Sequence, residues 1–63
     1  MEPKDIIWRL LDRLADEKRL FEESYQLIDK EKNKDLQHAI LECDQLLNTQ
    51  INILRRMQKR YDP

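Results

Sequence analysis

Apart from carboxylates, the residue types that most often carry chemistry are scarce in this chain. Cys43 falls in an apolar row of a helix, where a buried thiol behaves as a small hydrophobe rather than as a nucleophile. His38, the single histidine, falls on the outward side of that helix, without the further ligands that a zinc site needs. The sequence contains no Ser–His–acid arrangement and no Gly-rich phosphate loop. We therefore expect no enzyme activity, no metal, no cofactor and no small-molecule ligand.

Carboxylates are numerous, but on helix surfaces they usually stay solvated and pair with nearby Lys and Arg side chains. The spacing predicts ion pairing among Asp12, Asp16 and Arg19 within one helix. It directs Glu42 and Asp44 towards the opposite helix. These side chains are therefore interpreted as ion-pair partners rather than as general acids or bases. The set comprises Asp12, Asp16, Glu22, Glu23, Glu42 and Asp44.

A basic cluster lies near the C-terminus, in the run RRMQKR, and it comprises Arg55, Arg56, Lys59 and Arg60. The structural interpretation is that positive charge at the end of a helix is favoured by the helix dipole. The alternative is a nucleic-acid site, in which these cations bind phosphates and Tyr61 stacks on a base. The sequence leaves both interpretations open.

Three further side chains are candidates for setting the specificity of an interface. Trp8 stands next to an apolar helix row, where it either packs at the rim or contacts a partner. Lys18 and Gln50 interrupt the apolar rows of the two halves of the chain. Each either reaches water or a neighbouring polar group, or fixes the register and orientation of helix packing.

Two long helices must position these residues. The chain has no Gly, and its prolines stand at the extreme ends, so nothing inside it breaks a helix strongly. Apolar residues recur in both halves with the alternating three–four spacing of a helix seam. The first seam comprises Ile7, Leu11, Leu14, Lys18, Phe21, Tyr25 and Ile28. The second comprises the row Leu36, Cys43, Gln50 and Met57 beside the row Ile40, Leu47, Leu54 and Tyr61.

The two patterns differ in phase by one residue, and the shift falls in DKEKNKD, which has no apolar residue. We interpret the shift as a chain reversal near Lys32–Lys34, with Asn33 in a left-handed or helix-capping conformation. A continuous helix with one extra residue is the alternative. The predicted fold class is all-α, an antiparallel two-helix hairpin forming a single domain over residues 1–63. Its helices should span residues 3–30 and 35–61, with a turn over 31–34.

Folding the chain at this turn sets apolar residues of the two helices opposite each other, as a foldable sequence should. It also brings the basic cluster alongside the acidic residues near the N-terminus. The predicted pairs are Ile28 with Leu36, Tyr25 with Ile40, Phe21 with Cys43, Leu11 with Leu54 and Ile7 with Met57.

A hairpin of this size cannot bury all the apolar side chains it carries. Those beside the two seams would stay in water, although burial of each Leu or Ile is worth about 1.5–3 kcal/mol. We therefore expect two copies to associate as a homodimer into a four-helix bundle, with docking on a different protein as the alternative. The predicted interface residues are Ile6, Leu10, Leu20, Leu27, Ala39, Leu46, Ile51 and Ile53.

Charge and apolar content limit the partners of the chain. Charged residues make up 40% of it, yet the net charge is −1, which argues against recognition of a polyanion by bulk charge. No apolar run approaches the roughly 18–20 residues that cross a bilayer, so no membrane partner is expected. The segment MEPKDIIWRLL lacks the features of a signal peptide, and a single cysteine cannot form an internal disulfide. A cytoplasmic location is therefore expected.

Three families of short helical hairpins offer partial resemblances. In length and two-helix plan, the chain resembles the plasmid copy-number RNA-binding dimers. The segment ILECDQLLN, residues 40–48, is similar to the signature Ser-Gln-Glu-Leu-Asp of the small sporulation aspartyl-phosphate phosphatases, whose Glu and Asp are matched by Glu42 and Asp44. Ile40, Leu41 and Cys43 replace the other three signature residues. The segment AILECDQLLNTQINILRRMQKRY is similar in texture to the second helix of small secretion-system co-chaperones, which clamp a partner. We assign the chain to none of these families.

The expected function is that of a small non-enzymatic helical module. It would bind and regulate or chaperone another macromolecule through an amphipathic helical surface, as a homodimer. One alternative is a nucleic-acid-binding regulator that uses the basic cluster. Another is the response-regulator phosphatase that the second resemblance implies, with Asp44 as its functional residue.

Overall fold

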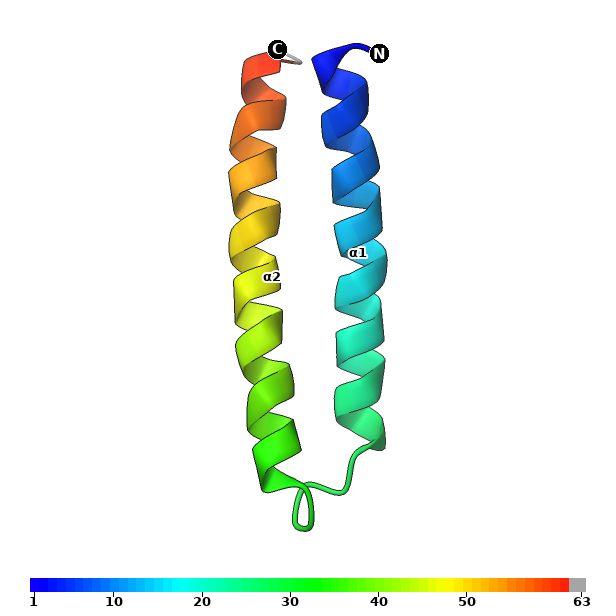
Figure 1. Cartoon of the computed structure of the whole chain (residues 1–63), viewed down its shortest axis with the longest axis vertical. Coiled ribbons are helices and arrows are strands. Elements are labelled where there is room, and N and C mark those ends of the chain that lie inside the picture. Colours follow the sequence, from blue (N-terminus) through cyan, green and yellow to red (C-terminus); the bar gives the residue numbers. More distant parts are fainter. Residues whose placement is uncertain (62–63) are drawn as a thin grey trace.

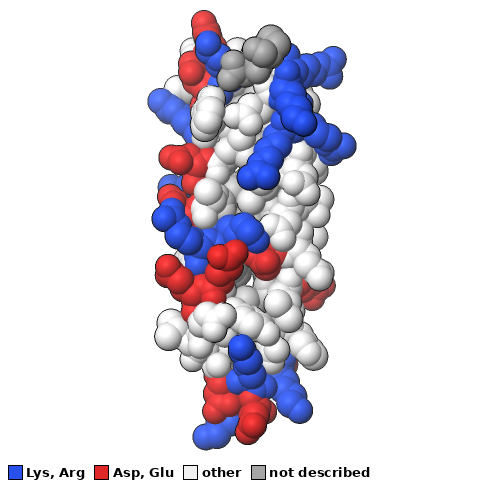
Figure 2. Space-filling model, turned by 180° about the vertical axis from the view of Figure 1, so that it is seen from behind, with Lys and Arg blue, Asp and Glu red and all other residues white. Residues whose placement is uncertain are grey.

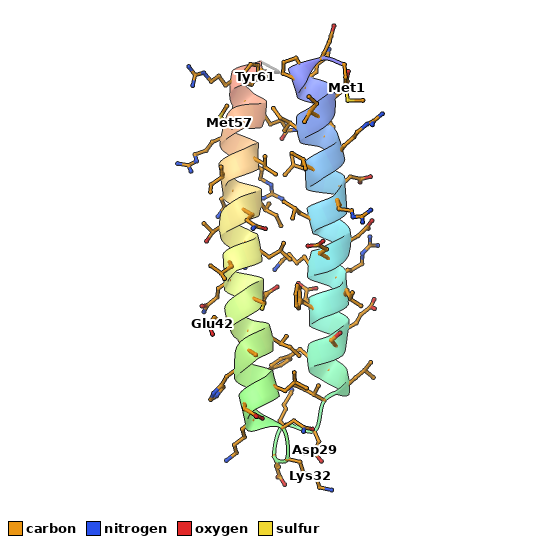
Figure 3. The ribbon with its side chains drawn as sticks, viewed as in Figure 1. Met1, Asp29, Lys32, Glu42, Met57 and Tyr61 are labelled. Atoms are coloured by element: carbon orange, nitrogen blue, oxygen red, sulfur yellow. The ribbon has the colours of Figure 1, made fainter. Side chains whose placement is uncertain are left out.

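The computed structural model describes residues 1–61 as two helices joined by a loop, α1 (Pro3–Leu27) and α2 (Lys34–Tyr61). The helices run antiparallel and side by side, so that Met1 and Tyr61 lie at the same end of the hairpin (Figures 1 and 3). Between Cα atoms the molecule measures 46 × 15 × 14 Å. The predictions of an all-α fold and of a chain reversal at mid-chain are confirmed.

Helix α1 begins at Pro3, because proline is well suited to the first turn, where its missing N–H costs no hydrogen bond. Glu2 precedes it in an extended conformation, and its carbonyl accepts hydrogen bonds from the N–H groups of Asp5 and Ile6, at 3.0 and 3.3 Å. The negative charge of Asp5 in the first turn is favoured by the helix dipole.

Helix α1 ends at Leu27 rather than at residue 30, because Ile28 adopts an extended conformation with φ −77° and ψ 149°. The following loop is organised by Asp29. Its Oδ1 accepts hydrogen bonds from the N–H groups of Glu31 and Lys32, at 3.0 and 3.1 Å. Such a side-chain-supported turn needs no positive φ, and none occurs in residues 1–61, which explains how the chain reverses without glycine.

Asn33 joins the loop to α2, which begins at Lys34. Its N–H donates to the Asp29 carbonyl at 2.8 Å, and its own carbonyl accepts from the N–H of Gln37 at 2.9 Å. Asn33 therefore occupies the capping position that the sequence predicts, but it is not left-handed.

The seam of α1 lies where the sequence predicts it. Ile7 is buried, and the other members of the predicted set are half-buried. In α2 the row of Ile40, Leu47 and Leu54 is also confirmed, with Leu47 only 4% exposed. This apolar contact line holds the two helices together.

The second row of α2 is displaced by one residue from the prediction. Leu36, Cys43 and Gln50 are exposed, as is Tyr61. The places of Leu36, Cys43 and Gln50 along the seam are taken by Gln37, Asp44 and Ile51, of which Ile51 is buried and the other two are half-buried. Met57, the last residue of the predicted row, is half-buried, as is its neighbour Gln58. The predictions of a buried Cys43, of Gln50 as a seam residue and of Ile51 as an outward interface residue are therefore wrong.

The lysine in the first seam accounts for this displacement. Lys18 Nζ donates to both Asp44 oxygens, at 3.3 and 3.4 Å. An ammonium group that is partly withdrawn from water is better accommodated by a carboxylate than by a thiol, because the opposite charge offsets the loss of hydration. A count of apolar residues along α2 favoured Cys43 for this seam position, although the spacing of the carboxylates already directed Asp44 towards the opposite helix.

The contact register also differs from the predicted one by less than one helical turn. Tyr25 lines a small groove together with its predicted partner Ile40, while its hydroxyl reaches one turn further and accepts a hydrogen bond from Gln37 Nε2 at 3.0 Å. Phe21 was predicted opposite Cys43, but it borders this groove with Ile40 and Asp44. The register moved because α1 ends earlier than predicted, so the loop begins nearer to the N-terminus.

Candidate functional site

One candidate surface is an unpartnered apolar face on one side of the hairpin. A groove of about 470 Å³ identifies this side of the hairpin, because it is lined by Leu10 and Arg13 of α1 and by Gln50 and Ile53 of α2. Residues seven apart on a helix share one side, so the rows containing these four residues define the face. The face comprises Ile6, Leu10, Leu20 and Leu27 from α1, and Leu36, Ala39, Cys43, Leu46 and Ile53 from α2.

All these side chains are exposed, including Leu27 at 86%, Leu20 at 63% and Leu46 at 62%. Only Ile7, Leu47 and Ile51 are buried within residues 1–61. The structure thus brings every predicted interface residue except Ile51 to one side of the molecule.

Two charged residues, Arg13 and Glu17, interrupt the apolar face near the middle of α1. Both line the 470 Å³ groove, whose other walls and floor are formed by Leu10, Leu14 and residues of α2. Neither takes part in an ion pair among residues 1–61. Neither residue is among the predicted interface residues, although heptad spacing from Ile6 and Leu10 places them in the same rows.

The opposite side of the hairpin carries the ionic contacts between the helices. Lys18 bridges Asp44 of α2 and Glu22 of its own helix, with Nζ 3.3 Å and 3.6 Å from the respective carboxylate oxygens. Figure 2 shows acidic and basic side chains meeting at mid-height of the hairpin. The predicted pairing of Asp16 with Arg19 is also present.

Trp8 lies on this second side and is 55% exposed. It lines another groove of about 470 Å³, together with Leu11, Ile51 and Arg55. The indole therefore packs along the rim of the seam and still presents a large aromatic surface to solvent. Both predicted aspects of Trp8 are compatible with this position.

The basic cluster lies over the end of α2, where Lys and Arg side chains gather in Figure 2. All four side chains are exposed, and none of them forms an ion pair within the described part of the chain. The salt bridges with Glu2, Asp5 and Asp12 that their predicted proximity would permit are thus not formed. Lys59 and Arg60 lie in the last turn, where the helix dipole favours cations.

The carboxylates named by the phosphatase resemblance do not converge. Asp44 faces Lys18 in the seam, towards the opposite helix as the spacing predicts. Glu42 points away from α1 (Figure 3), so its predicted direction towards the opposite helix is wrong. Over residues 1–61, no group of three His, Cys, Asp or Glu side chains is placed to hold a metal ion. Neither α1 nor α2 has a stretch of sufficient length and apolar character to cross a membrane.

Comparisons of the chain with models of protein families, with curated proteins and with solved structures find no match.

Proposed function

We propose that the protein is a non-enzymatic interaction module whose apolar face is covered by a second copy, giving a homodimeric four-helix bundle that binds and regulates or chaperones another macromolecule. The single observation that carries this proposal is the contrast between three buried apolar side chains and an entire exposed apolar face. A chain of this length needs more buried surface than one seam supplies. Covering each exposed Leu or Ile adds about 1.5–3 kcal/mol.

A second copy is favoured as the occupant because the face spans both helices along much of the rod, and an identical rod matches it in length and width. Two-fold association of identical patches is the commonest mode of protein self-assembly. The side that carries Trp8 and the Lys18 ion pairs stays open in such a dimer. The dimer therefore presents two copies of this open side to a protein partner, with the exposed indole as the main apolar contact.

Sedimentation equilibrium at micromolar concentration tests the dimer. We expect the wild-type chain to sediment as a dimer, and Leu46→Glu to sediment as a monomer, because it places two charges inside the contact. Gln45→Glu is the matched control, since it adds the same charge one residue away, outside the apolar rows. A folded wild-type monomer at every concentration would refute the proposal, as would equal weakening by both variants.

A second candidate function is nucleic-acid binding, which is favoured by the exposure of all four cations of the basic cluster. Replacement of the four by Gln should abolish a salt-sensitive interaction, because each lost phosphate contact lowers the salt slope of binding by about 0.9 for duplex DNA. Replacement of the loop residues Lys30 and Lys32 and of Lys34, the first residue of α2, by Gln controls for the general loss of positive charge. Unchanged binding by the cluster variant would exclude this surface.

A further inference from the structure

Near its middle, the apolar face carries one cation and one anion, which lie one helical turn apart. Arg13 and Glu17 lie near the middle of α1 and line the groove of this face. When a second copy covers the face, both groups lose water, and an unpaired charge in such a place is strongly destabilising. Each is stabilised there by an oppositely charged group, either its neighbour one turn away on α1 or a residue of the second copy.

Two symmetric arrangements stack one hairpin face on its copy with all four helices aligned, because the two-fold axis then lies in the interface either along the helices or across them. An axis along the helices puts both loops at the same end and lays α1 over α2 of the second copy. An axis across them puts the loops at opposite ends and lays each helix antiparallel against its own copy. The two arrangements bring different residues together.

The axis across the helices satisfies both charges. When it passes midway between Arg13 and Glu17, each Arg13 faces Glu17 of the other copy, and Leu10 faces Leu20. In the alternative arrangement, the register set by Lys18 and Asp44 determines what lies over α1. There Glu17 would be covered by Leu46 and Arg13 by Gln50, which gives the carboxylate no charged partner in the second copy.

The position of the groove favours the same axis. The groove lies beside Leu10, Leu14 and Ile53. It is therefore nearer to the end of the hairpin that holds the two termini than is an axis midway between Arg13 and Glu17. The axis across the helices therefore brings the protruding Leu20 of the second copy over this groove, as a knob enters a hole. The axis along the helices would place each groove over the identical groove, leaving an unfilled space that costs stability.

The axis across the helices, which was placed from residues of α1, also forms suitable residue pairs in α2. The hairpin register places the midpoint between Arg13 and Glu17 beside the stretch of α2 between Cys43 and Gln50. Rotation about that level sets Cys43 opposite Gln50 and Leu36 opposite Met57. It also separates the two basic clusters to opposite ends of a rod 46 Å long, whereas the other axis would put them together.

We infer that two copies of this chain pair through their apolar faces about a two-fold axis perpendicular to the helices, with loops at opposite ends and reciprocal Arg13–Glu17 ion pairs beside the axis. This inference rests on the proposed dimer and specifies its geometry. The ion pairs select one arrangement over the other, while the apolar residues supply most of the affinity.

Mixing two charge variants tests the ion pairs. Arg13→Glu leaves only acidic groups beside the axis, and Glu17→Arg leaves only basic groups. After exchange of equal amounts, native mass spectrometry should show heterodimers in about tenfold excess over the random proportion, because each homodimer repels itself. Each chain keeps its own altered pair within α1 in every dimer, so effects within one helix cancel. A random proportion of heterodimers would overturn the inference.

Disulfide trapping tests the axis in an otherwise unchanged chain, with Cys43 as the reporter. Gln50→Cys should yield a covalent dimer on mild oxidation. Cys43 and the new thiol stand about 10 Å apart on one helix, which is too far for an internal bond. Leu20→Cys, which would meet Cys43 under the other axis, should yield none, and neither should the wild-type chain. A covalent dimer from Leu20→Cys, or none from Gln50→Cys, would overturn the inference. If the wild-type chain still sediments as a dimer, the proposed function is unaffected by that result.

Discussion

The pair of Lys18 and Asp44 should couple the two helices by about 1 kcal/mol. The Lys18 Nζ lies 3.3 and 3.4 Å from the two Asp44 oxygens, and the two side chains remain 32% and 24% exposed. Hydrogen bonds to charged groups contribute about 1.5–3 kcal/mol in sheltered sites, whereas exposed ion pairs contribute about 0.2–1 kcal/mol. Partial exposure places this pair between the two ranges.

A double-mutant cycle measures this coupling through Lys18→Ala, Asp44→Ala and the double variant. Asp44→Ala should cost less than Lys18→Ala, because Lys18 keeps Glu22 at 3.6 Å, whereas Asp44 would lose its only ion-pair partner among residues 1–61. The coupling energy should be about 1 kcal/mol. The double replacement of Lys18→Met and Asp44→Leu should give a chain at least as stable as the wild type. Well-packed apolar side chains usually contribute at least as much to the free energy of unfolding as a buried ion pair of similar volume.

Urea unfolding followed by circular dichroism provides the free energies. All variants must be compared at one chain concentration, because association adds to the apparent stability. A coupling energy indistinguishable from zero would show that the pair is a solvated surface contact. A strong loss of stability in the Met–Leu variant would show that the seam at this level requires charge.

Three further predictions follow from other parts of the hairpin. Leu47→Ala should lower the free energy of unfolding by about 2–4 kcal/mol, because Leu47 is the most buried side chain of the seam; urea unfolding tests this, and a loss below about 1 kcal/mol would contradict it. Asp29→Ala should cost about 1 kcal/mol by removing two loop hydrogen bonds, whereas Asp29→Asn should retain most of the stability; equal losses would contradict the turn described. Cys43 should react with a thiol reagent faster in the monomeric Leu46→Glu variant than in the wild-type chain; equal rates would place Cys43 outside the dimer contact.

Periodicity was sufficient for the first helix. The alternating spacing of Ile7, Leu11 and Leu14 can occupy only one side of a helix, so the seam follows from the sequence whatever the partner is. The row of Ile40, Leu47 and Leu54 was predictable for the same reason. The loop was harder to place, because Ile28 completes the apolar pattern of α1 although its backbone has already left the helix.

The sequence by itself determined that the chain forms two amphipathic helical segments that differ in phase at a charged mid-chain stretch, and that it carries more apolar surface than one seam requires. These properties depend on composition and on spacing along one helix. The structure decided that this phase shift is a reversal rather than an extra residue in one continuous helix. The tertiary structure alone decided which flank of the Ile40 row meets α1, because that choice depends on Lys18, a residue more than twenty positions away in sequence. It also decided that Ile51 is buried while Cys43 is exposed, and that Arg13 and Glu17 share a groove with residues of α2. Such pairings between distant segments arise only when the two helices settle into a common register.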